Sequence, residues 1–515
     1  MSSFTRNNAW NNGGTFDNQD LLWYAKGVGV MMTRGLDDQN SWWFFAAIHG
    51  EYVTASNPPG FPNWADIPAP PKVPTAPLPA QNIQDLYWDQ CQHQSWFFPP
   101  WHRGYLIALE AQIRAAIVSL EGPADWALPY WNYFGPNNQY EIPPAFTAQT
   151  LPDGSANPLY VLARYGPNGN GNIFIPIPPV SEKCENNTLY TGSNSATRPP
   201  GFGGPKTGFS HSGGVSGNLE SNPHNQVHVD VGGSPPNNAQ IWGLMSDPGI
   251  AALDPIFYLH HSNIDRLWAA WNDNSNNNPN DPNWLNGPVA VGEREFAMPM
   301  PDGSSWVYTP ADVDSLGQLD YTYDDLSVAV TVNPAAKLTQ RLTMLGAAPE
   351  EAKVAAGGED MDAEENAELV GANETPLQIK SSGARTTVLL DTGVQNKVSA
   401  SLAVASEAAL PDQVYLQLEN VRGNMDAFKL TVSVNQQNAG TIALFGLRRA
   451  SQPDGGHGGE GLTFILDITP IIDNLFINNN LDADSLDVRI VPNQAVPDSA
   501  EITVGRVSVY RQGQQ

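Results

Sequence analysis

Residues 91–103 read CQHQSWFFPPWHR, with His93 and His102 on either side of an aromatic run and a proline pair. His93 lies in a stretch expected to be extended, and His102 lies where the prolines end that loop and a helix begins. From residue 102 to 120, leucine and isoleucine recur at helical spacing, which predicts a helix with one buried face.

The same helical spacing of apolar residues appears over three other ranges, 21–32, 41–50 and 255–271. Long segments rich in glycine, proline and asparagine, such as 57–80 and 133–217, lie between them. We therefore expect residues 1–335 to form a mainly α catalytic domain, in which a four-helix bundle holds the functional site and long loops wrap it.

Two further segments bring histidines to this bundle. Residues 221–228 read SNPHNQVH, so His224 and His228 lie four residues apart, on one face of a helix. Residues 254–265 read DPIFYLHHSNID and place His260 and His261 at the start of another helix. Adjacent helical side chains point about 100° apart, so these two histidines face different surroundings.

Histidines in three separate segments of this kind predict a metal site. A single histidine is more often a packing or capping residue than a ligand, but three such segments together make that interpretation improbable. Imidazole ligands suit copper in both of its oxidation states. Two copper ions could each donate one electron to O₂, and the pattern offers no carboxylate bridge of the kind that a di-iron site uses.

These segments resemble the copper signatures of the tyrosinase family, the type-3 copper proteins that include tyrosinases, catechol oxidases and molluscan hemocyanins. The residues that match the first signature are His93, Phe98-Pro99, Trp101-His102-Arg103, Leu106 and Glu110. Those that match the second are Asp254-Pro255, Phe257-Tyr258, His261 and Asp265. The run FAAIHG at 45–50 is similar to the segment that carries the family's first ligand. The resemblance covers residues 1–335.

The resemblance implies a type-3 site with two copper ions. It assigns one ion to His49, His93 and His102, and the other to His224, His228 and His261. The family pattern places the last ligand four residues before Asp265, which selects His261 over His260. His260, Arg103 and Asp265 are then expected to orient the ligands from behind.

Further roles follow from the same resemblance. Cys91, two residues before His93, is expected to form a thioether with that imidazole, the alternative being a buried thiol. Glu220 and Asn225 are expected to hold a water that deprotonates incoming phenols, although Glu220 could instead stabilise the start of a helix. Val229 and Pro248 are expected to line the substrate entrance.

The chain beyond residue 335 changes character twice. Residues 336–376 include a run dense in aspartate and glutamate, which predicts an acidic flexible linker. Residues 377–515 alternate apolar and polar residues over several short runs, which predicts an antiparallel β-sandwich. This domain faintly resembles the β-domain of plant polyphenol oxidases, which implies a latency domain freed by linker cleavage; the alternative is a permanent stabilising lid.

Composition narrows the possible partners. A net charge of −28 argues against nucleic acid and anionic membranes, and no apolar run is long enough to span a membrane. The start of the sequence has no signal-peptide pattern, so we expect a protein that is cytoplasmic or released without one. The expected function is oxidation of o-diphenols to o-quinones with O₂, and o-hydroxylation of monophenols. The alternatives are a catechol oxidase without monophenolase activity and a hemocyanin-like oxygen carrier.

Overall fold

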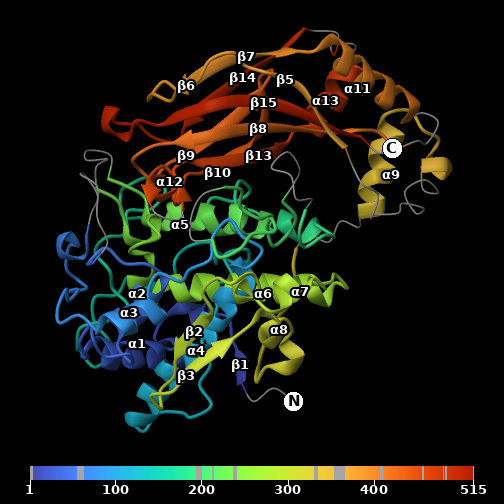
Figure 1. The fold of residues 1–515 in the computed structure, drawn as a ribbon. Helices are drawn as coiled ribbons and strands as arrows, with labels where there is room; N and C mark the ends of the chain where they lie inside the picture. Colours follow the sequence, from blue (N-terminus) through green and yellow to red (C-terminus); the bar gives the residue numbers. More distant parts are fainter. Residues whose placement is uncertain are drawn as a thin grey trace.

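The computed structural model describes residues 4–54, 63–192, 200–210, 214–235, 241–329, 334–352, 366–405, 410–454, 457–478, 481 and 484–513. Figure 1 shows a helical N-terminal domain, with a large β-sheet formed by the C-terminal part of the chain lying against it. Among the described residues, no helix is both long and apolar enough to cross a membrane.

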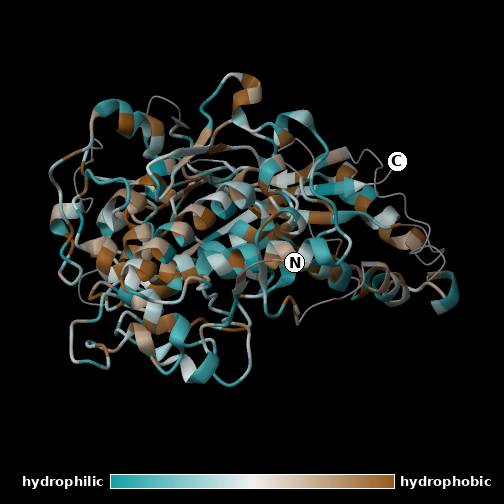
Figure 2. Ribbon diagram, turned by 90° about the horizontal axis from the view of Figure 1, so that it is seen from below, coloured by the Kyte–Doolittle hydropathy of each residue, from teal (hydrophilic) through white to brown (hydrophobic). Residues whose placement is uncertain are grey.

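The N-terminal domain is built on helices joined by long irregular segments. Its helices are α1 (Gln19–Met32), α2 (Trp42–His49), α3 (Gln81–Tyr87), α4 (Phe98–Ser119), α5 (Asn225–Gly232), α6 (Ile256–Asp273), α7 (Pro282–Leu285) and α8 (Pro310–Val313). Two small ladders close it, parallel β1 (Phe4–Arg6) with β4 (Tyr321–Tyr323), and antiparallel β2 (Phe296–Pro299) with β3 (Ser305–Tyr308). Figure 2 shows hydrophobic and hydrophilic residues mixed along the chain, and α2, α5 and α6 are buried on nearly all sides.

The four predicted helices are all present, with one shift at a boundary that matters. Helix α4 begins at Phe98 rather than at His102, and Pro99 and Pro100 occupy its first turn. Proline fits there because the first backbone N–H groups of a helix have no partner within the helix. The proline pair therefore starts the helix, and His102 lies one turn inside it.

Buried ion pairs fasten this bundle. Asp265 of α6 accepts from Arg103 of α4 at 2.5 Å and from Arg6 of β1 at 3.1 Å. The hydroxyls of Tyr321 and Tyr323 donate to the same carboxylate at 2.6 and 2.5 Å. Strands β1 and β4 and helices α4 and α6 thus meet at one carboxylate, which connects the two helices.

The C-terminal part forms the antiparallel β domain that its alternating pattern predicts. The strands of its main sheet are β5 (Asn366–Ala372), β6 (Leu377–Gln378), β7 (Ala384–Leu390), β8 (Gln413–Arg422), β9 (Lys429–Val434), β10 (Gln437–Ala443), β13 (Leu462–Asp467), β14 (Ser485–Pro492) and β15 (Thr503–Gly513). The order is β10-β9-β14-β7-β5-β15-β8-β13, with β6 beside β15. The two end strands, β10 and β13, pack against each other, so one sheet curls almost into a barrel and encloses the core.

Helices and a small ladder complete the second domain. They are α9 (Pro334–Met344), α11 (Thr392–Val404), α12 (Leu447–Ala450), α13 (Thr469–Ile477) and the pair β11 (Pro453–Asp454) with β12 (His457–Gly458). Helix α12 and the end of β10 face the N-terminal domain over α5 (Figure 1).

The predicted linker at 336–376 is wrong at both of its ends. Helix α9 lies across its start, and strand β5 forms part of the main sheet near its end. Arg341 of α9 pairs with Asp473 of α13 at 2.8 Å, and Leu342 is fully buried. The acidic composition concealed these buried contacts; residues 353–365 lie outside the described part of the chain.

Candidate metal centre

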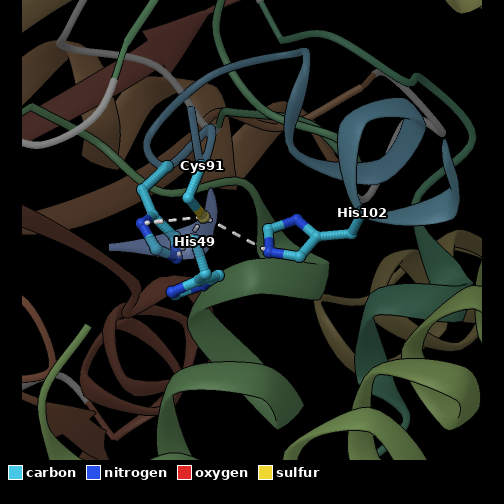
Figure 3. Close-up of side chains that lie close together, drawn as sticks. His49, Cys91 and His102 are labelled. Atoms are coloured by element: carbon cyan, nitrogen blue, oxygen red, sulfur yellow. Dashed lines mark hydrogen bonds between the residues drawn. The ribbon is translucent and has the colours of Figure 1, made fainter. Parts of the chain in front are cut away.

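Two groups of buried side chains face each other inside the helical bundle. One consists of His49, Cys91, His93 and His102, and the other of His224, His228, His260 and His261. Within each group the potential ligand atoms lie within 4.8 Å of one another. Figure 3 shows Cys91 and His102 pointing toward each other, with His49 beside them.

The histidines are carried by several elements of the N-terminal domain. His49 ends α2, His102 lies in α4, and His261 lies in α6, while His93 lies in the loop before α4. His224 ends a π-type turn over Glu220–His224 and directly precedes α5, which carries His228. The rings of His102 and His261 stack at 4.4 Å, so the two groups are adjacent.

Oxygen acceptors hold one nitrogen of four of these rings. The Nδ1 atoms of His49, His102 and His228 lie 2.9, 2.8 and 2.7 Å from the carbonyl oxygens of Pro248, Phe98 and Met245. His224 Nδ1 lies 2.8 Å from Asn225 Oδ1. A carbonyl accepts only from a protonated nitrogen, so these contacts place the proton on Nδ1 and leave the lone pair of Nε2 for a metal.

The Nε2 atoms converge at the spacing that one metal ion requires. His224 Nε2 and His228 Nε2 lie 3.2 and 3.3 Å from His261 Nε2. Nitrogens bound tetrahedrally at about 2.0 Å to one ion are about 3.3 Å apart. Lone pairs facing one another at this distance repel each other unless a cation lies between them, so this group fits a bound copper.

Burial keeps the imidazoles neutral, as ligation requires. In His102, His224, His228 and His261, desolvation is the main cause that lowers the pKa well below its usual range, and the proximity of the other histidines lowers it further. The aromatic rings of Phe98 and Phe257 enclose the centre, at 4.7 Å from the ring of His224 and 4.1 Å from that of His261.

His260 is a buried member of the second group, but its Nδ1 has a partner outside the group. Its Nδ1 lies 3.3 Å from the hydroxyl of Tyr133, and its ring stacks on that of His224 at 5.3 Å. This position suits a residue that orients His224. Of the two remaining histidines of the chain, His457 lies in β12, and His211 lies outside the described residues.

Cys91 lies against two rings of the first group. Its Sγ is 3.6 Å from both ring nitrogens of His93 and 3.4 Å from His102 Nε2. Burial raises the pKa of its thiol.

Glu220 and Asn225 adjoin the two histidine groups and are connected through a serine. Both oxygens of Glu220 accept from the backbone N of Gln94 at 3.0 Å, and one accepts from its side-chain Nε2 at 3.2 Å. The hydroxyl of Ser216 donates to Glu220 and lies 3.4 Å from Asn225 Nδ2. Burial raises the pKa of Glu220 to about 8. Glu220 thus holds the loop after His93, a role that the sequence analysis did not predict.

The two expected entrance residues have different surroundings. Val229 is buried against Ala443 and Phe445 of the β domain. Pro248 contributes its backbone carbonyl to His49, as described above, and this contact rather than its ring connects it to the centre.

Phe445 covers the second group and was missed by the sequence analysis. It follows β10 in the C-terminal domain, is 1% exposed, and stacks on the ring of His228 at 4.1 Å with an interplanar angle of 23°. Its ring also lies 5.7 Å from those of His93 and His224. The adjacent Gly446 has a φ of 80°, a turn that glycine favours, and this Phe-Gly pair was the available signal.

Comparison with known proteins identifies this arrangement. The model of the common central domain of tyrosinase matches residues 39–274, and that of a domain of unknown function, DUF7868, matches residues 366–512. Tyrosinase HcTyr1 of Hahella sp. (strain CCB-MM4) is 31% identical over 511 residues, which cover 95% of this chain and 96% of that protein. The chloroplastic catechol oxidase B of Solanum tuberosum is 34% identical over 192 residues, covering 35% of this chain and 30% of that protein.

Solved structures share the fold across both domains. The structure of latent apple tyrosinase aligns with a TM-score of 0.55 at 19% identity and covers 100% of this chain and 98% of that one. A latent aurone synthase, a polyphenol oxidase, aligns with a TM-score of 0.56 at 18% identity and covers 99% and 89%. The chain therefore belongs to the tyrosinase family of type-3 copper proteins. Its two histidine groups form a dinuclear copper centre, and it is a tyrosinase-family oxidase.

The choice between His260 and His261 can be tested by copper content. We expect His261→Ala to lose one of two bound coppers, because its Nε2 is the atom on which His224 and His228 converge. His260→Ala should keep both. The number of copper ions per chain after dialysis, measured by elemental analysis, decides which of the two histidines is the ligand. Loss of copper from His260→Ala with retention by His261→Ala would reverse the assignment.

Proposed function

We propose that this protein is a polyphenol oxidase of the tyrosinase type, which oxidises o-diphenols to o-quinones with O₂ and also hydroxylates monophenols. In the proposed site, His49, His93 and His102 hold one copper, and His224, His228 and His261 hold the other. The observation that carries the proposal is the convergence of neutral, buried imidazole nitrogens on two adjacent positions. Such a pair, when loaded, binds O₂ and takes two electrons from a substrate.

The covering aromatic ring supports a phenolic substrate. Phe445 shows that a flat six-membered ring fits against His228, nearly parallel to its imidazole. A phenol that replaced this ring would lie over the second group, with Val229 as its apolar wall. The buried walls exclude water from the centre, which protects reactive species and favours oxidation of the bound ring.

Proton transfer from a monophenol would use Glu220 and Asn225. Ser216 connects the two side chains, and Asn225 lies on His224, a ligand of the second copper. A carboxylate in this position can accept the phenolic proton through a water. We expect oxidation of an o-diphenol to depend less on such a base, because an o-diphenol needs no hydroxylation of its ring before it is oxidised.

Hydroxylation of monophenols distinguishes this proposal from the two alternatives, a catechol oxidase without monophenolase activity and an oxygen carrier. With copper loaded, we expect turnover of both tyramine and catechol, and we expect Glu220→Gln to lower tyramine hydroxylation by about 10²-fold while lowering catechol oxidation far less. Both are measured as quinone formation. If Glu220→Gln lowers the turnover of both substrates equally, Glu220 only holds the loop after His93 and is not the base for monophenols. Turnover of catechol alone would indicate a catechol oxidase, and reversible O₂ binding without turnover an oxygen carrier.

We further propose that Cys91 Sγ and a ring carbon of His93 become joined by a thioether once copper is bound. The S–H and ring C–H bonds are broken, and their two protons and two electrons pass to O₂, the oxidant of the proposed reaction. The sulfur already contacts the imidazole at 3.6 Å, and the bond would fix a ring that lies in a loop rather than on a helix. The peptide that contains both residues should then be lighter by two hydrogens in copper-loaded protein than in protein produced without copper. Identical masses, with a thiol that reacts after unfolding, would rule the bond out.

The β domain is proposed to keep the enzyme latent, with Phe445 occupying the place of the substrate ring. The ring is buried and stacked on His228, so a phenol can enter only after it leaves. Binding is weakened in proportion to the fraction of molecules in which the site is open. Cleavage within residues 353–365, which the acidic sequence there suggests, is the proposed physiological route to opening.

Removing the covering ring tests latency without a protease. We expect Phe445→Ala to raise kcat/KM for catechol by about tenfold or more in the uncut chain, since it vacates the site. A protease cut engineered into residues 353–365 should raise it in wild type. Phe476→Ala, on helix α13 of the same domain, is the matched control and should change nothing. Unchanged activity in both the Phe445 variant and the cut chain would leave the domain as a permanent lid.

A further inference from the structure

One short segment orients a histidine in each group. The carbonyl oxygen of Met245 lies 2.7 Å from His228 Nδ1, and that of Pro248 lies 2.9 Å from His49 Nδ1. These carbonyls are three residues apart in the connection between α5 and α6. The position of residues 245–248 therefore sets the direction of two imidazole rings at once, one facing each proposed copper.

Asp247 anchors this segment from within. Its carboxylate is fully buried and accepts from the hydroxyl of Tyr52 at 2.6 Å, from the backbone N of Gly249 at 3.0 Å and from Trp242 Nε1 at 3.2 Å. Its charged partner is Arg448, whose Nη2 donates to Oδ2 of Asp247. A buried carboxylate is held in place mainly by such a partner, because leaving it without one is costly.

Arg448 belongs to the β domain, in helix α12, three residues after Phe445. It is 1% exposed, and its guanidinium lies 4.8 Å from the ring of Trp242. Nη2 also donates to the hydroxyl of Tyr52 at 2.9 Å. Behind it, Asp426 accepts the backbone N of Arg448 at 2.7 Å and lies 3.9 Å from its Nε. Asp426, in the same domain, thus holds Arg448 from one side, and on the other side the guanidinium pairs with Asp247.

We propose that Arg448 is a positioning residue for the copper centre: through Asp247 it holds the Met245–Pro248 carbonyls that orient His228 and His49. The inference rests on the proposed ligand roles of those two histidines. Groups that hydrogen-bond the far nitrogen of a ligand imidazole fix its orientation, and losing them weakens metal binding. Without the guanidinium, the buried carboxylate of Asp247 loses its charged partner, and residues 245–248 shift. The rings of His228 and His49 then lose the carbonyl acceptors that fix their orientation.

The β domain would then act on the centre in two opposite ways. Phe445 blocks the approach to His228, whereas Arg448 helps to build the site that Phe445 blocks. Removing the ring and removing the guanidinium should therefore have different results, although the two residues are only three positions apart.

The test compares copper binding by full-length variants. Arg448→Met removes the ion pair, and Arg448→Lys keeps the charge, so it should fold even if the methionine variant does not. A lysine cannot reproduce the planar fork that reaches Asp247 and Tyr52 together. Arg385→Met is the matched control, because Arg385 lies on strand β7 of the same domain in an ion pair with Asp487, its side chain 73% exposed. Thermal melting of the copper-free proteins checks that each variant is folded.

The readouts are copper per chain during dialysis against a competing chelator, and the electron paramagnetic resonance signal of Cu(II). A coupled Cu(II) pair gives no signal, whereas a single Cu(II) does. We expect copper affinity to fall about tenfold or more in Arg448→Met, with a Cu(II) signal appearing, and to fall by an intermediate amount in Arg448→Lys. Wild type and Arg385→Met should keep two silent coppers.

Three results would overturn the inference. If wild type binds the pair and folded Arg448 variants bind it equally well, Arg448 only fastens the domains, and the ligand assignment stands. Equal copper loss in Lys429→Met, which breaks the interdomain pair with Asp230 at 2.6 Å, would assign the effect to domain docking as a whole. Failure of wild type to bind two coppers would instead overturn the proposed ligands, and this inference with them.

Discussion

An imidazole ring offers two nitrogens, and a hydrogen bond at one of them decides where the other points. In this protein carbonyl oxygens from Phe98, Met245 and Pro248 and the side chain of Asn225 take that role for four histidines. The remaining nitrogens converge inside a space enclosed by aromatic rings. Much of the surrounding structure can be understood as the means of keeping those acceptors still, because a carbonyl that moves turns the ring it holds.

The acceptors are held by elements that lie far apart in the chain. The carbonyl of Phe98 lies at the start of α4, which is fastened to α6 through the buried Asp265. The other two carbonyls lie in a connection that the second domain contacts. The same domain contacts α5 through the ion pair of Lys429 with Asp230 and through a hydrogen bond from Gln226 Nε2 to the carbonyl of Thr441. In addition, the backbone N of Thr463 donates to the carbonyl of Gly214. The interface therefore follows the helix that carries His228. The domain that covers the centre with Phe445 is thus also the domain that contacts this helix.

The sequence was most informative where local chemistry and spacing coincide. The histidines, the helical core and the alternating strands could all be recognised because each depends on residues near one another in the chain. Its failures have physical causes. The prolines at 99 and 100 fit a first helical turn as well as a loop end, and the acidic run concealed a helix that buries Leu342 and a strand of the main sheet. Phe445 and Arg448 contact residues about two hundred positions away in the chain, and a local pattern does not show which distant residue a side chain will meet.

Strand β1 pairs with β4, so residues 4–6 lie beside residues 321–323, and Arg6 reaches the carboxylate that joins α4 to α6. During synthesis, this first strand has no partner until more than three hundred residues have followed it. Contacts between such distant positions form late, because closing a long loop is entropically costly. The helical bundle thus reaches its final form only after most of the chain has left the ribosome.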